Sequence, residues 1–545
     1  MIRPLPPMIL LLALTLTACT AGAGASDQPS APESSADGPG STAQPASGPL
    51  APVGDTPPDA YAARPIPPAQ IDAAVAGLDT MVAEVMERSG VPGMSVAVVR
   101  GGKTVYAKGF GVKKVGEPGK IDPDTVFQLA SLSKSIGSTC VSAAVSKGQL
   151  AWSDPVTDHL PDFTLSDPRV TQQLTVADLF AHRSGLPPEA GDDLEAFGYD
   201  RDYILSHLDE FPLRPFRISY GYSNFGLTTG AEAAAAAAKT PWEKLCADEL
   251  YTPLKMASTS SSHADFTARE NKATLHFRSA EKKFEPLYLR DPDAQSPAGG
   301  VSSTANDLAS WMIMNLAGGK IGGEALIKTD VLQESHTTQI INGPAETAPS
   351  RSRSYGYGFN VETTSTGHVK LGHSGAFYVG AGTAFALLPA ADVGIVVLTN
   401  GSPVGAAEAI TTGFTDLVRT GAVERDWLDF FGTIFGGLFV NRSSVAEPAP
   451  AGAKPPRSLD AYVGTYTNDY LGDVVVARSD DRLTVSLGPK KLTAPLTPYD
   501  GDTFSWLAPG GNGDPVSAVT FAGGGDQATT MEIELVQIPQ LQRKE

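Results

Sequence analysis

A serine and a lysine three residues apart are the first candidates for chemistry in this sequence. Ser131 and Lys134 form the pattern S-x-x-K at the start of a predicted helix, where one turn places both side chains on the same face. A serine hydroxyl loses its proton when it attacks, and a neutral lysine accepts that proton if burial lowers the pKa of the amine. The pair therefore predicts nucleophilic catalysis. The spacing alone is a weak signal, because it recurs by chance at Ser279 and Lys282.

Two further motifs carry groups suited to the same reaction. Tyr222 and Asn224 belong to Y-S-N, in which the phenol could hydrogen-bond the nucleophile or the leaving group and the amide could bind a substrate carbonyl. His373 and Gly375 belong to H-S-G on a predicted strand, where the glycine would let a substrate backbone approach the strand edge. Each motif alone is common, and a lone histidine is more often structural than catalytic.

The order of the three motifs, with a mostly helical stretch between the first and the last, resembles the serine β-lactamase and penicillin-binding superfamily. The resemblance is to its class C-like branch of carboxypeptidases, esterases and D-amino-acid peptidases. Other stretches that look like this family are GMSVAV at 93–98, GQLAWSDPV at 148–156, LFAHRSGLP at 179–187 and PAGGVSST at 297–304. The resemblance covers about residues 68–425, and it implies a serine hydrolase of that fold.

Carried over to this sequence, the resemblance makes Ser131 the acylated nucleophile and Lys134 its proton acceptor. Tyr222 would pass a proton to the leaving group, and Asn224 would hold the substrate. His182, in the family-like L-x-x-H-x-S-G-L stretch, is expected to organise a turn and is left out of the catalytic set.

His373 stands where β-lactamases usually carry the lysine of K-T-G, and it resembles instead the secreted actinomycete-type D-alanyl-D-alanine carboxypeptidase and the esterases. The resemblance gives His373 a catalytic role and places Ser374, Gly375 and Ala376 against the substrate, with the N–H groups of Ser131 and Ala376 as the oxyanion hole. Because Ser374 also replaces a threonine, we expect β-lactams to acylate slowly rather than to be hydrolysed efficiently.

The spacing of apolar residues predicts the helices and strands that must position these residues. A helical apolar face starts at 71 and stops at Gly90, and a hairpin of strands follows at 94–100 and 104–109 around Gly101 and Gly102. Further strands are expected at 355–361, 368–371, 382–388 and 393–398, and a helix at 405–420. The fold class is therefore α/β (α+β), an antiparallel sheet flanked by helices that encloses a helical insertion.

A second, smaller domain is expected at the end of the chain. Residues 426–457 would form an apolar packing segment and a Pro/Ala linker. Beyond them, short alternating runs separated by turn residues predict an all-β domain over 458–545, at 462–466, 474–477, 483–487, 503–507, 516–521 and 531–536. This tail is similar to the lipocalin-like β-domain that some family members carry.

The beginning of the chain has the pattern of an export signal. Residues 1–19 combine one arginine, a short apolar run and small residues, and Leu16 to Cys19 (L-T-A-C) resemble the bacterial lipobox. An ordinary signal peptide with a coincidental cysteine is the alternative. Residues 20–66 contain few large apolar side chains and predict a disordered tether. We therefore expect an exported protein of the bacterial cell envelope, attached to the membrane only by a lipid on Cys19, on its periplasmic or extracellular face.

The composition limits the partners and cofactors that the protein is expected to bind. With 41 Lys and Arg against 60 Asp and Glu, the formal net charge is −19, which disfavours nucleic acid. Cys140 and Cys246 lie in apolar helical stretches where buried free thiols are common, and a disulfide between them is the alternative. Neither has the close His, Cys or Asp companions of a metal site, so no metal is expected. Acyl transfer of this kind needs no organic cofactor.

Two rival interpretations remain open at this stage. G-H-S-G-A, around Ser374, is near the nucleophile elbow of α/β-hydrolases, but the residues after it look like strand, and His373 is the last histidine of the chain. Alternatively, the domain is a non-catalytic cell-envelope module that binds peptidoglycan or a peptide. The favoured function is cleavage of an amide or ester bond in a small peptide or ester, with peptidoglycan-derived peptides as one candidate substrate. A homo-oligomer is an open alternative to a monomer.

Overall fold

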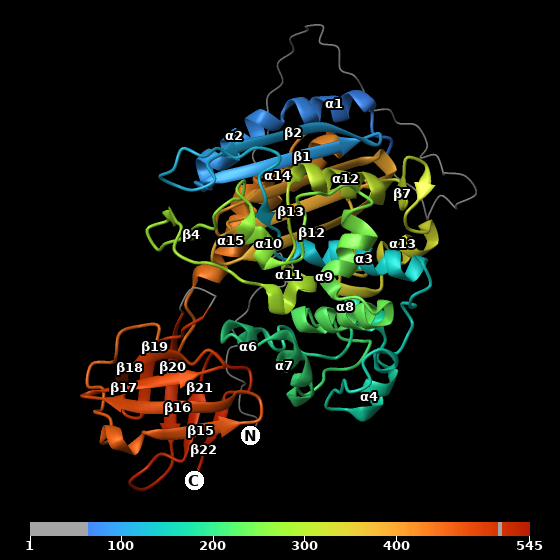
Figure 1. Cartoon of the computed structure of the whole chain (residues 1–545). Helices are drawn as coiled ribbons and strands as arrows, with labels where there is room; N and C mark the ends of the chain where they lie inside the picture. Colours follow the sequence, from blue (N-terminus) through green and yellow to red (C-terminus); the bar gives the residue numbers. More distant parts are fainter. Residues whose placement is uncertain (1–63, 511–514) are drawn as a thin grey trace.

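The computed structural model describes residues 64–510 and 515–545 (Figure 1). The expected signal peptide, Cys19 and nearly all of the expected tether (20–66) lie outside the described residues. The centre of the molecule is an eight-stranded antiparallel sheet. Its strands, in spatial order, are β2 (Lys103–Gly111), β1 (Gly93–Arg100), β14 (Val393–Thr399), β13 (Ala381–Leu388), β12 (Val369–Phe377), β11 (Asn360–Thr363), β10 (Arg353–Tyr355) and β9 (Ile340–Gly343).

Helices cover both faces of this sheet. On one face lie the terminal helices α1 (Pro68–Ala76), α2 (Leu78–Ser89), α14 (Ala406–Thr420) and α15 (Trp427–Gly436), whose apolar side chains form one core with the sheet. On the other face lie α3 (Leu132–Ser146) and α12 (Ala305–Leu316). The predicted α+β architecture, with its sheet built from both ends of the domain, is confirmed.

The insertion between β2 and β9 is mostly helical, as predicted. Besides α3 and α12 it contains α4 (Pro168–Gln173), α5 (Val176–Phe180), α6 (Asp192–Ala196), α7 (Arg201–Ser206), α8 (Asn224–Ala238), α9 (Trp242–Cys246), α10 (His263–Ala268), α11 (Ser296–Gly299) and α13 (Thr329–Ser335). Three two-stranded ribbons add β3 (Phe127–Gln128) with β6 (Ser302–Ser303), β4 (Phe277–Arg278) with β5 (Phe284–Glu285), and β7 (Lys320–Ile321) with β8 (Glu324–Ala325).

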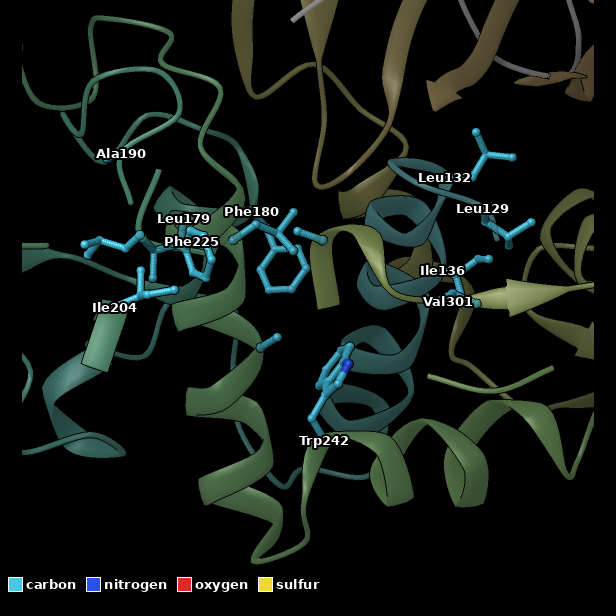
Figure 2. Packing of buried hydrophobic residues seen from close by; sticks show 14 of the residues in the cluster. Leu129, Leu132, Ile136, Leu179, Phe180, Ala190, Ile204, Phe225, Trp242 and Val301 are labelled. Atoms are coloured by element: carbon cyan, nitrogen blue, oxygen red, sulfur yellow. The ribbon is translucent and has the colours of Figure 1, made fainter. Parts of the chain in front are cut away.

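A second apolar core holds the insertion against α3. Leu132 and Ile136 of α3 belong to the same buried cluster as Phe180, Phe225 and Trp242 from α5, α8 and α9 (Figure 2). All five side chains are buried. Because α3 is packed from several sides, the residues at its start are held in a fixed environment.

Cys140 and Cys246 form a disulfide, with their Cα atoms 5.3 Å apart. The expectation of two free buried thiols is therefore wrong. Both cysteines do lie in apolar helices, as expected, but α9 packs directly against α3, so the two thiols meet. This contact joins helices that are far apart in the sequence, which is why local context could not reveal it.

The single strand expected over 355–361 is also wrong. The chain leaves the sheet between β10 and β11, and its turn packs on α3, where the Ser135 hydroxyl donates to the carbonyl oxygen of Gly358 at 2.5 Å. Gly358 has a φ of 75°, and a Cβ there would lie 2.5 Å from the carbonyl oxygen of Lys134. Glycine is required at this position by both the backbone conformation and the close approach to α3.

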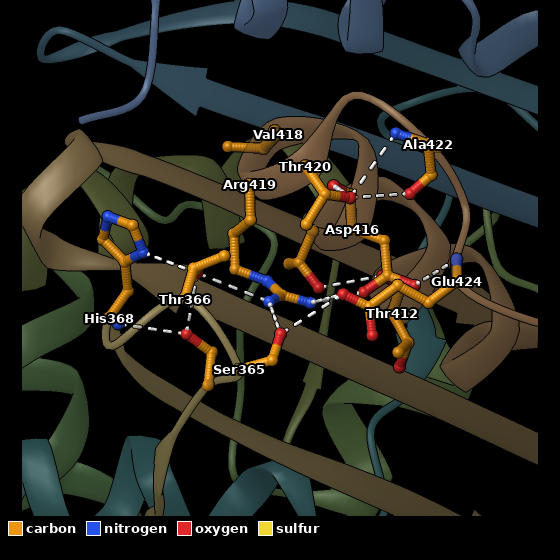
Figure 3. A network of polar contacts seen from close by, with 12 residues as sticks. Ser365, Thr366, His368, Thr412, Asp416, Val418, Arg419, Thr420, Ala422 and Glu424 are labelled. Carbon is orange, nitrogen blue, oxygen red and sulfur yellow. Dashed lines mark hydrogen bonds and ion pairs between the residues drawn. The ribbon is translucent and has the colours of Figure 1, made fainter. Parts of the chain in front are cut away.

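A buried ion pair fixes the end of α14 (Figure 3). Arg419 donates to Asp416 one turn earlier, and both side chains are almost fully buried. Arg419 also donates to the Ser365 hydroxyl at 2.9 Å, in the turn between β11 and β12. Trp427 at the start of α15 donates to Asp416 Oδ2 at 2.6 Å. The network therefore links α14, α15 and the turn that leads into β12.

The C-terminal part is a closed eight-stranded barrel, which confirms the predicted all-β, lipocalin-like domain. Its strands are β15 (Gly464–Asn468), β16 (Gly472–Ser479), β17 (Arg482–Leu487), β18 (Leu492–Asp500), β19 (Thr503–Leu507), β20 (Val516–Ala522), β21 (Thr530–Ile533) and β22 (Gln540–Arg543). Two strands were missed. Pro495 and Pro498 masked β18, and β22 is short and mostly polar.

Candidate active site

The S-x-x-K motif opens α3, as predicted. Ser131 is the N-cap residue, and the lysine one turn later places its Nζ 3.1 Å from Ser131 Oγ. Ala130, directly before the serine, has a φ of 48°, a left-handed conformation that is uncommon for a non-glycine residue. The chain therefore enters the helix through a strained turn that presents the hydroxyl beside the amine.

Lys134 has three oxygen neighbours. Besides Ser131 Oγ, its Nζ lies 2.6 Å from Asn224 Oδ1 and 2.9 Å from the carbonyl oxygen of Ala298. The last two oxygens can only accept. A neutral amine has two N–H bonds and one lone pair, so when both N–H bonds are donated to Asn224 and Ala298, the lone pair is left for the serine hydroxyl. The geometry is that of a base directed at Ser131.

The electrostatics agree with this arrangement. Lys134 is completely buried, and desolvation lowers the pKa of its amine to about 7. The carboxylates of Asp192 and Glu195 act in the opposite direction and keep the pKa from falling further. A lysine with a pKa near neutrality is suited to accepting a proton from a serine at that pH.

Tyr222 lies on the other side of the same amine, with Lys134 Nζ 4.5 Å from the centre of its ring. Burial raises the pKa of the Tyr222 hydroxyl above its usual value, and a hydrogen bond with Ser131 lowers it in part. The side chain therefore remains a phenol, which can donate a proton. Its ring packs against His182, whose centroid lies 4.6 Å away.

The side chain of His182 contacts the Y-x-N motif. Its backbone is left-handed, with a φ of 55°, and its Nδ1 accepts a hydrogen bond from the N–H of Ser223 at 3.2 Å. Burial holds the pKa of this imidazole well below its ordinary value, so the ring is neutral. His182 thus contacts the site, although only a turn-forming role had been expected of it.

Asn224 is the first residue of α8, and the hydroxyl of Ser223 caps this helix by accepting from the N–H of Gly226 at 2.9 Å. Both the oxygen and the nitrogen of the Asn224 side-chain amide form hydrogen bonds. Oδ1 accepts from Lys134, and Nδ2 donates to Asp192 Oδ2 at 2.7 Å. Burial raises the pKa of Asp192 to about 8. Asn224 therefore connects the base to a buried acid that sequence reasoning missed.

His373 lies on β12 with partners on both ring nitrogens. Nδ1 donates to the carbonyl oxygen of Ser374 at 2.7 Å, because a carbonyl only accepts. Nε2 then accepts from the Tyr355 hydroxyl at 2.9 Å. Burial lowers the pKa of His373 to about 3, so the imidazole is neutral at physiological pH. The structure brings His373 near Tyr222, with 6.3 Å between ring centres.

Ser374 and Gly375 take opposite sides of the strand. The hydroxyl of Ser374 donates to Glu408 of α14, on the sheet face away from α3. Gly375 approaches the nucleophile so closely that a Cβ would lie 3.0 Å from the backbone nitrogen of Ser131. The ladder with β11 ends at Gly372, so within the described residues 373–377 pair only with β13. This free edge, which includes Ala376, lies beside Ser131.

The structure thus brings together Ser131, Lys134, Tyr222, Asn224 and His373, from α3, α8 and β12. It adds Asp192, Tyr355 and Glu408, which no motif marked; only the acidic character of the loop around Asp192 hinted at a role. In the part of the chain that the structure describes, no group of three or more His, Cys, Asp or Glu side chains could hold a metal ion. No helix of residues 64–510 or 515–545 is long and apolar enough to cross a bilayer.

Comparison with known families places these motifs in context. The family model described as "Beta-lactamase" matches residues 78–418, and the model "Domain of unknown function (DUF3471)" matches residues 448–544. The first match includes the S-x-x-K, Y-x-N and H-x-G motifs, and the second includes the whole barrel.

Individual relatives are distant. Unguisins hydrolase ungD' of Aspergillus campestris is 29% identical over 246 residues, which are 42% of this chain and 45% of that protein. Protein flp of Staphylococcus aureus is 23% identical over 44% of this chain and 48% of its own length, so the chain spans about half the length of these relatives. The D-alanyl-D-alanine-carboxypeptidase/endopeptidase AmpH of Escherichia coli is 24% identical over 66% of this chain and 91% of its own.

Among solved structures, an octameric penicillin-binding protein homologue from Pyrococcus abyssi has the same fold. The two superpose with a TM-score of 0.56 at 19% sequence identity, covering 86% of this chain and 99% of the other. The similarity therefore extends beyond the sheet and its helices.

Proposed function

The chain belongs to the beta-lactamase family, and from its site we propose an exported serine hydrolase that cleaves an amide or ester bond through an acyl-enzyme on Ser131. One observation carries the proposal. Lys134 Nζ lies 3.1 Å from Ser131 Oγ and within hydrogen-bond distance of two acceptors, Asn224 Oδ1 and the carbonyl oxygen of Ala298, so the neutral amine has its lone pair left for the serine hydroxyl.

In the proposed reaction, Lys134 takes the proton of Ser131 as Oγ bonds to the substrate carbonyl carbon. The carbonyl oxygen becomes an oxyanion, which the N–H groups of Ser131 and Ala376 would stabilise at the free edge of β12. The leaving group departs with a proton from Tyr222, whose hydroxyl is hydrogen-bonded to Ser131 and is replenished from Lys134. Water then attacks the acyl carbon and gives a proton to Lys134, which passes it to Ser131 Oγ as the bond to the acyl carbon breaks and the acid is released.

For the substrate we propose a small peptide that contains D-amino acids, of the kind released from peptidoglycan, with small esters as the alternative. The name of one relative, a D-alanyl-D-alanine-carboxypeptidase/endopeptidase, supports amide cleavage, and the name of another, a hydrolase of unguisins, supports hydrolysis. We further propose export to the cell envelope with Cys19 as the lipid anchor. The anchor predicts that the full-length protein sediments with membranes and that Cys19→Ala releases it; equal sedimentation of both would overturn it.

The nucleophile is tested by covalent labelling. Ser131 Oγ should attack the phosphorus of a fluorophosphonate and expel fluoride. The resulting single adduct is located by intact mass and peptide mapping. Ser131→Ala should abolish labelling and turnover of D-alanyl-D-alanine peptides and small esters. Ser279→Ala is the matched control, because Ser279 belongs to the other S-x-x-K and lies half-buried in the turn between β4 and β5. A fluorescent penicillin, tested separately, should label Ser131 slowly.

Three results would change the proposal. An adduct on Ser374 would favour the nucleophile-elbow alternative. No adduct in a folded protein would favour the non-catalytic binding module. Labelling by the phosphonate without labelling by penicillin would keep the hydrolase and favour an esterase or aminopeptidase.

A further inference from the structure

A short segment lies between the active site and the barrel. Residues 188–193, called here the bridging segment, lead into the first turn of α6. Figure 1 shows α6 beside the barrel, and the contacts agree. The backbone N–H of Gln537 donates to Asp193 Oδ2 at 2.8 Å, its side-chain amide donates to the carbonyl oxygen of Pro188 at 3.3 Å, and the Tyr470 hydroxyl donates to Asp193 Oδ1. The barrel thus holds both ends of the segment.

The opposite side of the segment holds the Y-x-N motif. The N–H of Glu189 donates to the backbone carbonyl of Tyr222 at 3.0 Å. Asp192 accepts from Asn224, whose Oδ1 in turn accepts from Lys134. The two adjacent aspartates therefore bind in opposite directions, Asp192 to the active site and Asp193 to the barrel.

The segment has little freedom to adjust. Gly191 between its two halves has a φ of 88°, and a Cβ there would lie 2.6 Å from the Ile204 side chain. Its N–H donates to the Tyr470 hydroxyl, so this phenol accepts from one residue of the segment and donates to another. Tyr470 is fully buried and packs edge-on against Phe211, with 5.4 Å between ring centres. Burial of this kind makes the contact between barrel and segment specific in position.

We propose that Tyr470 and Gln537 of the barrel are positioning residues for catalysis, which act through the bridging segment on Asn224 and so on Lys134. The proposal rests on the serine-hydrolase function proposed above. The barrel is then part of the catalytic apparatus, although none of the contacts described requires it to touch the substrate.

The test compares two conservative variants of the full-length chain. Tyr470→Phe keeps the ring and its packing but removes both hydrogen bonds to the segment. Tyr466→Phe is the matched control, because Tyr466 is equally buried and its hydroxyl donates within the barrel, to Tyr462. Tyr470→Phe should lower the rate of fluorophosphonate labelling at Ser131 roughly tenfold, because the segment that supports Asn224 loses two buried hydrogen bonds. Tyr466→Phe should stay within about twofold of the wild type.

The pH dependence separates positioning from a general loss of structure. The carboxyl group of Asp192 accepts from Asn224 and its charge is coupled to that of Lys134, so Asp192→Asn should shift the midpoint of labelling against pH. Tyr470→Phe frees Asp193 and so loosens the segment that carries Asp192, which should move the midpoint in the same direction. In the double variant Tyr470→Phe should add little to Asp192→Asn, because both changes act through one chain of contacts.

The outcomes are distinct. If the wild type is not labelled at Ser131, the hydrolase function itself fails. If the wild type is labelled and Tyr470→Phe keeps its rate and midpoint, or if its effect and that of Asp192→Asn multiply, the positioning role is wrong. Circular dichroism and melting verify that each variant folds. If Tyr470→Phe does not fold, Gln537→Ala, which removes only the bond to Pro188, provides the same comparison.

Discussion

The hydroxyl of Tyr355 lies 2.9 Å from Nε2 of His373 and donates to it, while Nδ1 of the same ring is bound to a backbone carbonyl. The imidazole is thus fixed in one tautomer and, with a pKa of about 3, in one charge state. A residue in this state can shape the electrostatics beside Ser131 without changing its own charge between about pH 5 and about pH 9.

We therefore expect that His373→Gln lowers kcat/KM without altering the position of the acid limb in its pH profile. Tyr355→Phe leaves Nε2 buried without a donor and should cost roughly tenfold in kcat/KM. Tyr357→Phe, two residues along and also buried, is the control and should have little effect. An acid limb that disappears in His373→Gln would show that the imidazole titrates after all.

The acid limb of the profile should belong to Lys134. Since the pKa of its amine is about 7, kcat/KM should rise between about pH 6 and about pH 8 as the neutral form accumulates. Lys134→Arg keeps a positive charge that cannot be removed in this range, and it should reduce acylation at least roughly a thousandfold. Lys282→Arg, in the exposed S-x-x-K, should behave as the wild type. Activity retained by Lys134→Arg would contradict the proposed proton path.

Glu408 should make stability depend on pH. Burial raises the pKa of its carboxyl from about 4.5 to about 7. Because the folded-state pKa is the higher one, its contribution is fully present below about pH 4.5 and is lost as the pH rises through about 7, by about 3 kcal/mol in total. Glu408→Gln still offers an oxygen to Ser374 and cannot ionise. Its free energy of unfolding in urea, relative to the wild type, should therefore increase from pH 4.5 to pH 7; a constant difference would contradict this.

The buried pair of Arg419 and Asp416 should matter far more than an exposed one. Arg419→Ala leaves a buried carboxylate without its cation and should lower the free energy of unfolding by about 3–5 kcal/mol. Arg88→Ala removes a pair with Asp426 in which both side chains are largely exposed, and it should cost less than about 1 kcal/mol. Urea denaturation of both variants provides the comparison, and equal losses would refute it.

Much of the sheet was predictable because β1, β13 and β14 are buried along almost their whole length and mostly apolar. The hairpin of β1 and β2, the strands β13 and β14, and the helix α14 agree with the sequence patterns to within a few residues. The motif residues on α3 and α8 were also predictable, since one helical turn fixes the distance between Ser131 and Lys134.

The remaining site residues depend on long-range packing. Asp192 and Asp193 are identical in type and adjacent, and only the position of α6 between the cleft and the barrel gives them opposite roles. Tyr355 reaches His373 across β11, which separates β10 from β12 in the sheet. The disulfide likewise depends on α9 packing against α3. A pattern within one element contains no information on such partners.

The contacts of the bridging segment also have a consequence in time. Asp193 is synthesised early, whereas Tyr470 and Gln537, which bind its side chain, leave the ribosome only after the whole sheet has emerged. We expect a nascent chain that stops in the linker before the barrel to contain Ser131 and Lys134 but to lack the support of Asn224. Completion of the barrel would then raise the reactivity of Ser131, so that an unfinished chain carries a nucleophile that reacts more slowly.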